Sequence, residues 1–263
     1  MDDISSELKL EAKVIPVVET IPADLLTPLS VYLKLSAGAA NSFLLESVEG
    51  GKSLARYSFI GADPEFVVSG NDRHTVISRN EGKQELEGGV LKFVKNHFKQ
   101  LQAESDVDLP SFIGGAIGYL GFECSEWFEP SLKEDDRDSA GGGEAAFMFY
   151  RSIVAFDHAK QLIKIISLVF EKAGDDIDRL RQAAADRNRA IRTELETGEL
   201  RIPGLDPGRH TGLPSLNWRR ERFETAVDDI KEMIRAGECY QVVLSQRFTK
   251  QTNASSVGIY RAL

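Results

Sequence analysis

The sequence predicts an α+β fold in which packed antiparallel sheets are flanked by helices. Two observations lead to this prediction. Pairs of short apolar runs separated by turn residues indicate β-hairpins, and separate stretches with helical spacing indicate amphipathic helices. The hairpins follow one another instead of alternating with helices, which favours α+β over a parallel βαβ sheet. The chain has 263 residues, of which 42% are hydrophobic and 28% charged, as in ordinary soluble globular proteins.

The first half of the chain carries most of the predicted hairpins. Residues 15–21 form a short predicted strand, and Pro28 at an early helical position predicts a first helix over residues 29–35. Further elements are expected in this order: a hairpin of residues 41–48 and 56–60, a hairpin of 66–69 and 75–78, an amphipathic helix over 89–102, and a glycine-dense strand over 113–119.

The second half combines a long hairpin with three helices. The expected elements are a hairpin of residues 147–156 and 162–170, a helix from Asp175 or Asp176 to about Gly198, a helix through Phe223 and Ile234 that Gly237 ends, a strand over 240–248, and a helix capped by Ser255.

A linker divides these elements into two expected domains. Residues 199–216 are rich in proline and glycine, so we place the boundary near 212 and expect domains at 1–212 and 213–263. The last helix ends on the apolar Leu263 with no glycine and no polar tail. We therefore interpret the chain as a truncated fold.

Charge and composition argue against several function classes. The net charge of −9 and pI near 5.1 argue against nucleic acid as the main partner. The acidic N-terminus does not resemble a signal peptide, and the longest apolar run, residues 162–170, is too short to span a bilayer. We expect a cytoplasmic protein without a membrane partner. The two cysteines and four histidines show no metal-ligand spacing.

The first segment with functional potential is the hairpin near residue 46. Glu46 can accept hydrogen bonds from an ammonium group, Ser47 can donate or accept one, and Arg56 could pair with Glu46 across the hairpin. The alternative is that this segment is only a strand end with a capped turn.

Two further segments allow a structural and a functional interpretation. In the strand Gly114–Glu123, glycines permit either close packing of strands or one wall of a pocket. In the segment Ile234–Phe248, a helix ends at glycine and leads into a strand whose polar face starts with Gln241. Neither segment specifies a reaction by itself.

Together the three segments resemble the large subunit (component I) of anthranilate synthase, a chorismate-utilising enzyme family. The resemblance covers roughly residues 15–263, and its motifs are long. The matching stretches, in chain order, are residues 44–51, 56–61, 114–123, 237–248 and 259–263.

The resemblance implies a lyase that converts chorismate and ammonia to anthranilate and pyruvate in tryptophan biosynthesis. Ammonia would come from glutamine through a separate amidotransferase subunit, component II. Magnesium, held by carboxylates, would bind the chorismate carboxylate. The resemblance places those carboxylates and the catalytic histidine beyond Leu263, so the isolated chain is expected to be inactive.

The resemblance also assigns roles to individual residues. Leu45, Glu46 and Ser47, with Tyr57 nearby, would form part of an allosteric site for the inhibitor L-tryptophan. Gln241 stands where isochorismate synthases carry a water-activating lysine, which suits an enzyme that adds ammonia instead. The alternatives are aminodeoxychorismate synthase component I and a non-catalytic tryptophan-binding lobe.

Overall fold

The computed structural model describes residues 12–46, 56–99, 101–103, 108–132, 144–202 and 212–263. The chain divides into two compact units, Met1–Arg201 and Ile202–Leu263. This division lies within the predicted linker over residues 199–216. The assignment of 1–212 and 213–263 as separate functional domains remains a prediction.

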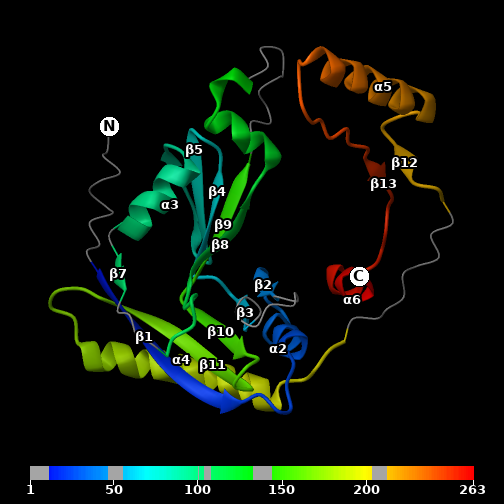
Figure 1. The fold of residues 1–263 in the computed structure, drawn as a ribbon. Coiled ribbons are helices and arrows are strands. Elements are labelled where there is room, and N and C mark those ends of the chain that lie inside the picture. Colours follow the sequence, from blue (N-terminus) through cyan, green and yellow to red (C-terminus); the bar gives the residue numbers. More distant parts are fainter. Residues whose placement is uncertain (1–11, 47–55, 100, 104–107, 133–143, 203–211) are drawn as a thin grey trace. The chain divides into compact units, whose positions relative to one another are not determined.

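The first unit contains a six-stranded sheet with the order β2-β3-β10-β11-β1-β7 (Figure 1). All neighbours are antiparallel except β1 and β7, which are parallel. The strand β7 was not predicted, and β1 is longer than expected. The strands are β1 (Ala12–Pro22), β2 (Ser42–Leu45), β3 (Tyr57–Ala62), β7 (Leu101–Ala103), β10 (Ser152–Asp157) and β11 (Leu162–Glu171).

A second, five-stranded sheet in the same unit has the order β6-β5-β4-β9-β8, with antiparallel neighbours throughout. Its strands are β4 (Phe66–Gly70), β5 (His74–Arg79), β6 (Gly82–Glu87), β8 (Gly115–Leu120) and β9 (Ala145–Tyr150). The α+β class with antiparallel sheets is thereby confirmed.

One predicted hairpin is wrong in its first arm. Residues 147–156 belong to two strands, because one strand ends at Tyr150 and the next begins at Ser152 in the other sheet. The part before Arg151 is β9 of the five-stranded sheet, and the part after it is β10, which pairs with β11. Arg151 and Ser152 interrupt the apolar residues at this point, but the sequence prediction joins the apolar stretches on both sides into one strand.

Helices cover both sheets of the first unit. The helix α2 (Pro28–Leu35) begins at Thr27, which forms a reciprocal capping box with Ser30. The helix α4 (Ile177–Thr197) is capped by Asp176 and packs along β11 and β1 (Figure 1). The remaining helices are α3 (Val90–Lys99) on β4 and β5, and the short 3₁₀ helices η1 (Phe122–Trp127) and η2 (Pro130–Leu132).

Buried apolar side chains form clusters on each sheet and one cluster that combines residues of both sheets, and their burial is the main stabilising term. Between the six-stranded sheet and its helices, the buried side chains include Val31, Ile60, Ile163, Ile165 and Leu195. Between the five-stranded sheet and α3, they include Phe66, Val68, Val90, Phe93 and Phe149.

The second unit contains two helices and a short antiparallel pair. Gly237, with φ of 80°, ends α5 in the left-handed conformation that favours glycine. The elements are β12 (Ser215–Leu216), α5 (Arg220–Ala236), β13 (Phe248–Thr249) and α6 (Ser256–Ala262), the last capped by Ser255 as predicted.

The strand predicted over residues 240–248 is wrong for most of its length. Only Phe248 belongs to a strand, and residues 240–247 pair with no described strand. Tyr240 is 94% and Val243 81% exposed. An alternating pattern shows only that a segment suits a sheet, whereas a strand also requires a neighbour for its backbone groups. Across the described residues, no helix combines the length and apolar character that a membrane crossing requires.

Candidate functional site

The hairpin of β2 and β3 places two of the predicted inhibitor residues on one face of the sheet. Leu45 is paired with Phe59, which lies two residues from Tyr57, and alternate residues of a strand share a face. The Tyr57 and Phe59 rings lie 5.9 Å apart, and Leu45 is 46% exposed. The result is a partly exposed apolar surface at one end of the hairpin.

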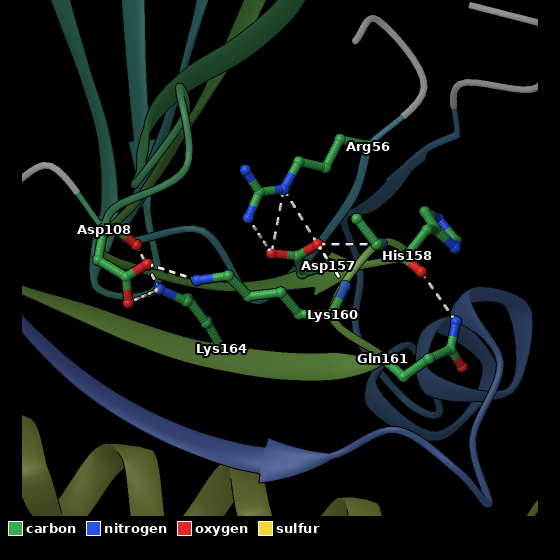
Figure 2. A network of polar contacts seen from close by, with 8 residues as sticks. Arg56, Asp108, Asp157, His158, Lys160, Gln161 and Lys164 are labelled. Atoms are coloured by element: carbon green, nitrogen blue, oxygen red, sulfur yellow. Dashed lines mark hydrogen bonds and ion pairs between the residues drawn. The ribbon is translucent and has the colours of Figure 1, made fainter. Parts of the chain in front are cut away.

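Arg56, directly before β3, is held by an aspartate at the end of β10. Its Nη2 donates to Oδ2 of Asp157 at 2.6 Å, and its Nε lies 3.1 Å from Oδ1 (Figure 2). The expected pairing of Arg56 with Glu46 is therefore replaced by one with Asp157. The guanidinium also lies 4.8 Å from the centre of the Tyr57 ring, a cation–π distance.

Asp157 is fully buried and organises the turn that follows it. Oδ1 accepts hydrogen bonds from the backbone N–H groups of Ala159 and Lys160, both at 3.1 Å. Burial raises the pKa of the Asp157 carboxyl, but hydrogen bonds from Arg56 and the turn outweigh it, so the pKa lies below its ordinary value. The carboxylate is ionised at neutral pH.

A second carboxylate extends this network. Asp108 accepts from Lys160 Nζ at 2.8 Å through Oδ1 and from Lys164 Nζ at 3.0 Å through Oδ2 (Figure 2). Lys164 is buried on β11 and also donates to the Asp108 carbonyl. Hydrogen bonds from Lys160 and Lys164 lower the pKa of Asp108 to about 2. The network thus ties the segment around Asp108 to the β10–β11 turn.

A serine and a histidine also meet beside this network. Ser58 Oγ lies 2.8 Å from Nε2 of His158, the residue after Asp157. Ser58 is only 1% exposed, so no substrate can reach its hydroxyl. The pair joins β3 to the turn and does not form a nucleophile site.

At the centre of the glycine-rich strand β8, Gly118 allows close packing against the neighbouring strand β9. A Cβ at Gly118 would lie 2.0 Å from the Ala146 carbonyl oxygen and 2.7 Å from the Phe147 Cα, both in the neighbouring strand β9. Only glycine fits so close to another backbone. For Gly118, the structure supports strand packing over a pocket wall.

The predicted site residues lie in different parts of the chain. Leu45 and Tyr57 come together, and Glu46 is half-buried after β2. Ser47 lies outside the described residues. Gln241 is exposed in the second unit. Sequence reasoning missed Asp157 because the run 157–160 indicated only a turn.

Among the described residues, no three acidic, histidine or cysteine side chains come together as they would around a metal ion. The magnesium site implied by the resemblance remains a prediction.

A comparison with protein families matches residues 40–263 to the chorismate binding enzymes. The chain belongs to this family. It is 35% identical over 97% of its length to the probable anthranilate synthase component 1 of Schizosaccharomyces pombe, and 35% identical over 98% to anthranilate synthase component 1 of Acetivibrio thermocellus. It covers 49% and 53% of those proteins, respectively.

The fold agrees with the sequence comparison. The crystal structure of anthranilate synthase component I from Streptococcus pneumoniae TIGR4 matches 93% of this chain with a TM-score of 0.55 and 25% sequence identity. The match covers 52% of that structure. This member of the chorismate binding enzyme family therefore spans about half the length of its curated relatives.

Proposed function

We propose that this chain supplies one half of an anthranilate synthase component I, the lyase that converts chorismate and ammonia to anthranilate and pyruvate. The observation that carries the proposal is the 35% identity over nearly the whole chain to component 1 proteins from a fungus and a bacterium. A glutamine amidotransferase subunit would supply the ammonia.

The elimination chemistry would be completed by the half of the relatives that this chain does not span. The described residues hold no cluster of acidic side chains for magnesium. Residues 240–247, which carry the polar face with Gln241, present exposed side chains such as Tyr240 and Val243. In the proposed complete enzyme, these residues pair with strands of the other half and are buried there.

Gln241 is the residue of this chain that we assign to the active-site strand. A glutamine amide has no basic group that could deprotonate water at neutral pH. The residue is therefore suited to an enzyme whose nucleophile is ammonia, because ammonia is a stronger nucleophile than water and needs no base to activate it.

The hairpin surface around Leu45 is the proposed regulatory site for L-tryptophan. The half-buried Glu46 would accept hydrogen bonds from the ammonium group, with Ser47 beside it. The partly exposed apolar surface of Leu45 and Tyr57 would contact the indole ring. The bonds between Arg56 and Asp157 fix the start of β3 and so the position of Tyr57.

The proposal is tested by growth rescue. This chain is fused to the part of the Acetivibrio thermocellus relative that it does not span, and the fusion is expressed in one bacterium that requires tryptophan and in another that requires p-aminobenzoate. The first strain lacks its own anthranilate synthase component I, so only anthranilate formation restores its growth without tryptophan, and we expect this rescue.

A matched fusion serves as the control. It joins the aligned half of the Schizosaccharomyces pombe relative to the same second half. If that control rescues tryptophan growth and the fusion with this chain does not, the proposal fails. Rescue of the p-aminobenzoate requirement alone would assign the chain to an aminodeoxychorismate synthase instead.

A further inference from the structure

A cavity of about 710 Å³ lies in the first unit, lined by residues of both sheets and of α3 and α4. Leu45, Tyr57 and Gln241 are not among its lining residues, so it is separate from the sites proposed above. Its volume falls in the range of roughly 300–1,000 Å³ that is typical of small-molecule sites.

Aromatic side chains form one wall of this cavity. Phe149 of β9 stacks on Phe66 with ring centres 4.4 Å apart and on Phe98 at 5.9 Å. His97 lies 5.0 Å from the Phe149 ring, and burial lowers the pKa of its imidazole, so it is a neutral ring at neutral pH. This wall suits the face or edge of an aromatic ligand.

Basic side chains outnumber acidic ones around the cavity, although the whole chain carries a net charge of −9. Arg151, between β9 and β10, is neutralised by Glu65, with Nη2 at 2.6 Å from Oε1. The second acidic lining residue, Asp175, accepts a hydrogen bond from the backbone N–H of Lys172. Glu65 is thus paired with a cation, whereas Asp175 has one backbone hydrogen bond.

Arg187 of α4 is a cation of the cavity lining whose hydrogen-bond donors have few acceptors among the described residues. Its Nε is buried and has no hydrogen-bond partner among them, and its Nη2 lies 3.5 Å from the Leu168 carbonyl, at the limit of a hydrogen bond. Burial, and then the nearby Arg151, lower the pKa of this guanidinium. A buried donor without an acceptor is costly, so an anion placed here would be stabilising.

We propose that this cavity binds a small aromatic carboxylate, with the carboxylate on Arg187 and the ring against Phe149 and Phe98. Guanidinium groups match the two oxygens of a carboxylate, and the aromatic wall takes the rest of the ligand.

The test uses the 263-residue chain with 2-naphthoate as the probe and the neutral 2-naphthylmethanol as the matched compound. Binding is measured by calorimetry and mapped by amide chemical shifts. We expect the alcohol to bind at least about tenfold more weakly than the acid, because a charge-assisted hydrogen bond is lost. Shifts are expected at Gly114 and Gly115, which line the cavity.

Variants on α4 locate the anion. Arg187→Gln should weaken naphthoate binding about tenfold and leave the alcohol unchanged. Arg189→Gln is the control, because Arg189 is exposed on the same helix and pairs with Asp186. Ala183→Trp, at an exposed lining position, should block the binding of both compounds, and it replaces Arg187→Gln if that variant does not fold.

Three results would overturn the proposal. They are equal binding of the acid and the alcohol, chemical-shift changes confined to other regions, and equal effects of the two arginine variants.

Discussion

Arg56 and Asp157, which are 101 positions apart, form a hydrogen-bonded ion pair that joins the start of β3 to the end of β10. The carboxylate is buried and the guanidinium is partly exposed, with 36% of its side chain accessible. Tyr57, a residue of the proposed inhibitor surface, lies opposite Asp157 in the sheet, so the ion pair fixes the strand that carries it.

Replacing this carboxylate should destabilise the first unit. In Asp157→Ala, the turn amides of Ala159 and Lys160 and the guanidinium of Arg56 lose their acceptor. We expect a loss of about 2–3 kcal/mol in the free energy of unfolding, measured by urea denaturation. Asp24→Ala, at an exposed aspartate, should change it by less than about 0.5 kcal/mol. A loss for Asp157→Ala as small as this control would contradict the structural role.

The stability of the chain should depend on pH through Asp108. Its pKa is lowered from 3.8 to about 2 by hydrogen bonds from Lys160 and Lys164. A depressed pKa means that the stabilisation is fully present above the unfolded pKa near 3.8 and is lost as pH falls toward 2. Wild type should therefore exceed Asp108→Asn in stability at pH 6, and the difference should shrink below pH 4. A carboxyl titration by NMR with an unshifted midpoint would contradict this account.

Gly118 should not tolerate a side chain. In Gly118→Ala, the new Cβ would lie against the Ala146 carbonyl oxygen and the backbone of Phe147, neither of which can rotate away. We expect a melting temperature several degrees below that of the wild type. We also expect faster hydrogen exchange of the backbone amides that pair β8 with β9. Gly212→Ala is the control, because nothing lies within 4 Å of that added Cβ. Equal melting temperatures for the two variants would show that β8 and β9 can move apart freely.

If the proposed inhibitor site is right, a substitution in it should weaken inhibition by tryptophan without changing the uninhibited kcat. In the completed enzyme, Ser47→Phe should raise the tryptophan concentration needed for half-inhibition at least about tenfold and leave the uninhibited kcat nearly intact. Leu25→Phe is the control: Leu25 is 90% exposed, and its replacement should leave inhibition unchanged. Wild-type inhibition in Ser47→Phe would remove this assignment.

Local patterns predicted most elements of the fold because their causes are local. Asp176 and Ser255 cap helices as predicted, Pro28 is the first residue of α2, and Gly237 ends α5. The change of sheet at Arg151 was not predicted. Arg151 and Ser152 interrupt the apolar run, but two polar residues do not show which partner strand each side pairs with.

The candidate site was predictable only in part. Leu45 and Tyr57 lie on adjacent strands of one hairpin, so sequence order already brings them together. The partner of Arg56 is Asp157, from a hairpin 101 residues further along, and nothing in the local pattern prefers it to Glu46. Such long-range ion pairs follow from the strand order of the sheet, which the hairpin patterns leave open.

The most direct measurement is the product formed from chorismate. The fusion of this chain with the second half of the Acetivibrio thermocellus relative is purified and supplied with chorismate, ammonium and magnesium, and the products are separated by liquid chromatography. The proposed function predicts anthranilate and pyruvate in equal amounts, and none from the 263-residue chain alone. Aminodeoxychorismate as the product, or anthranilate formed by the chain without its second half, would contradict it.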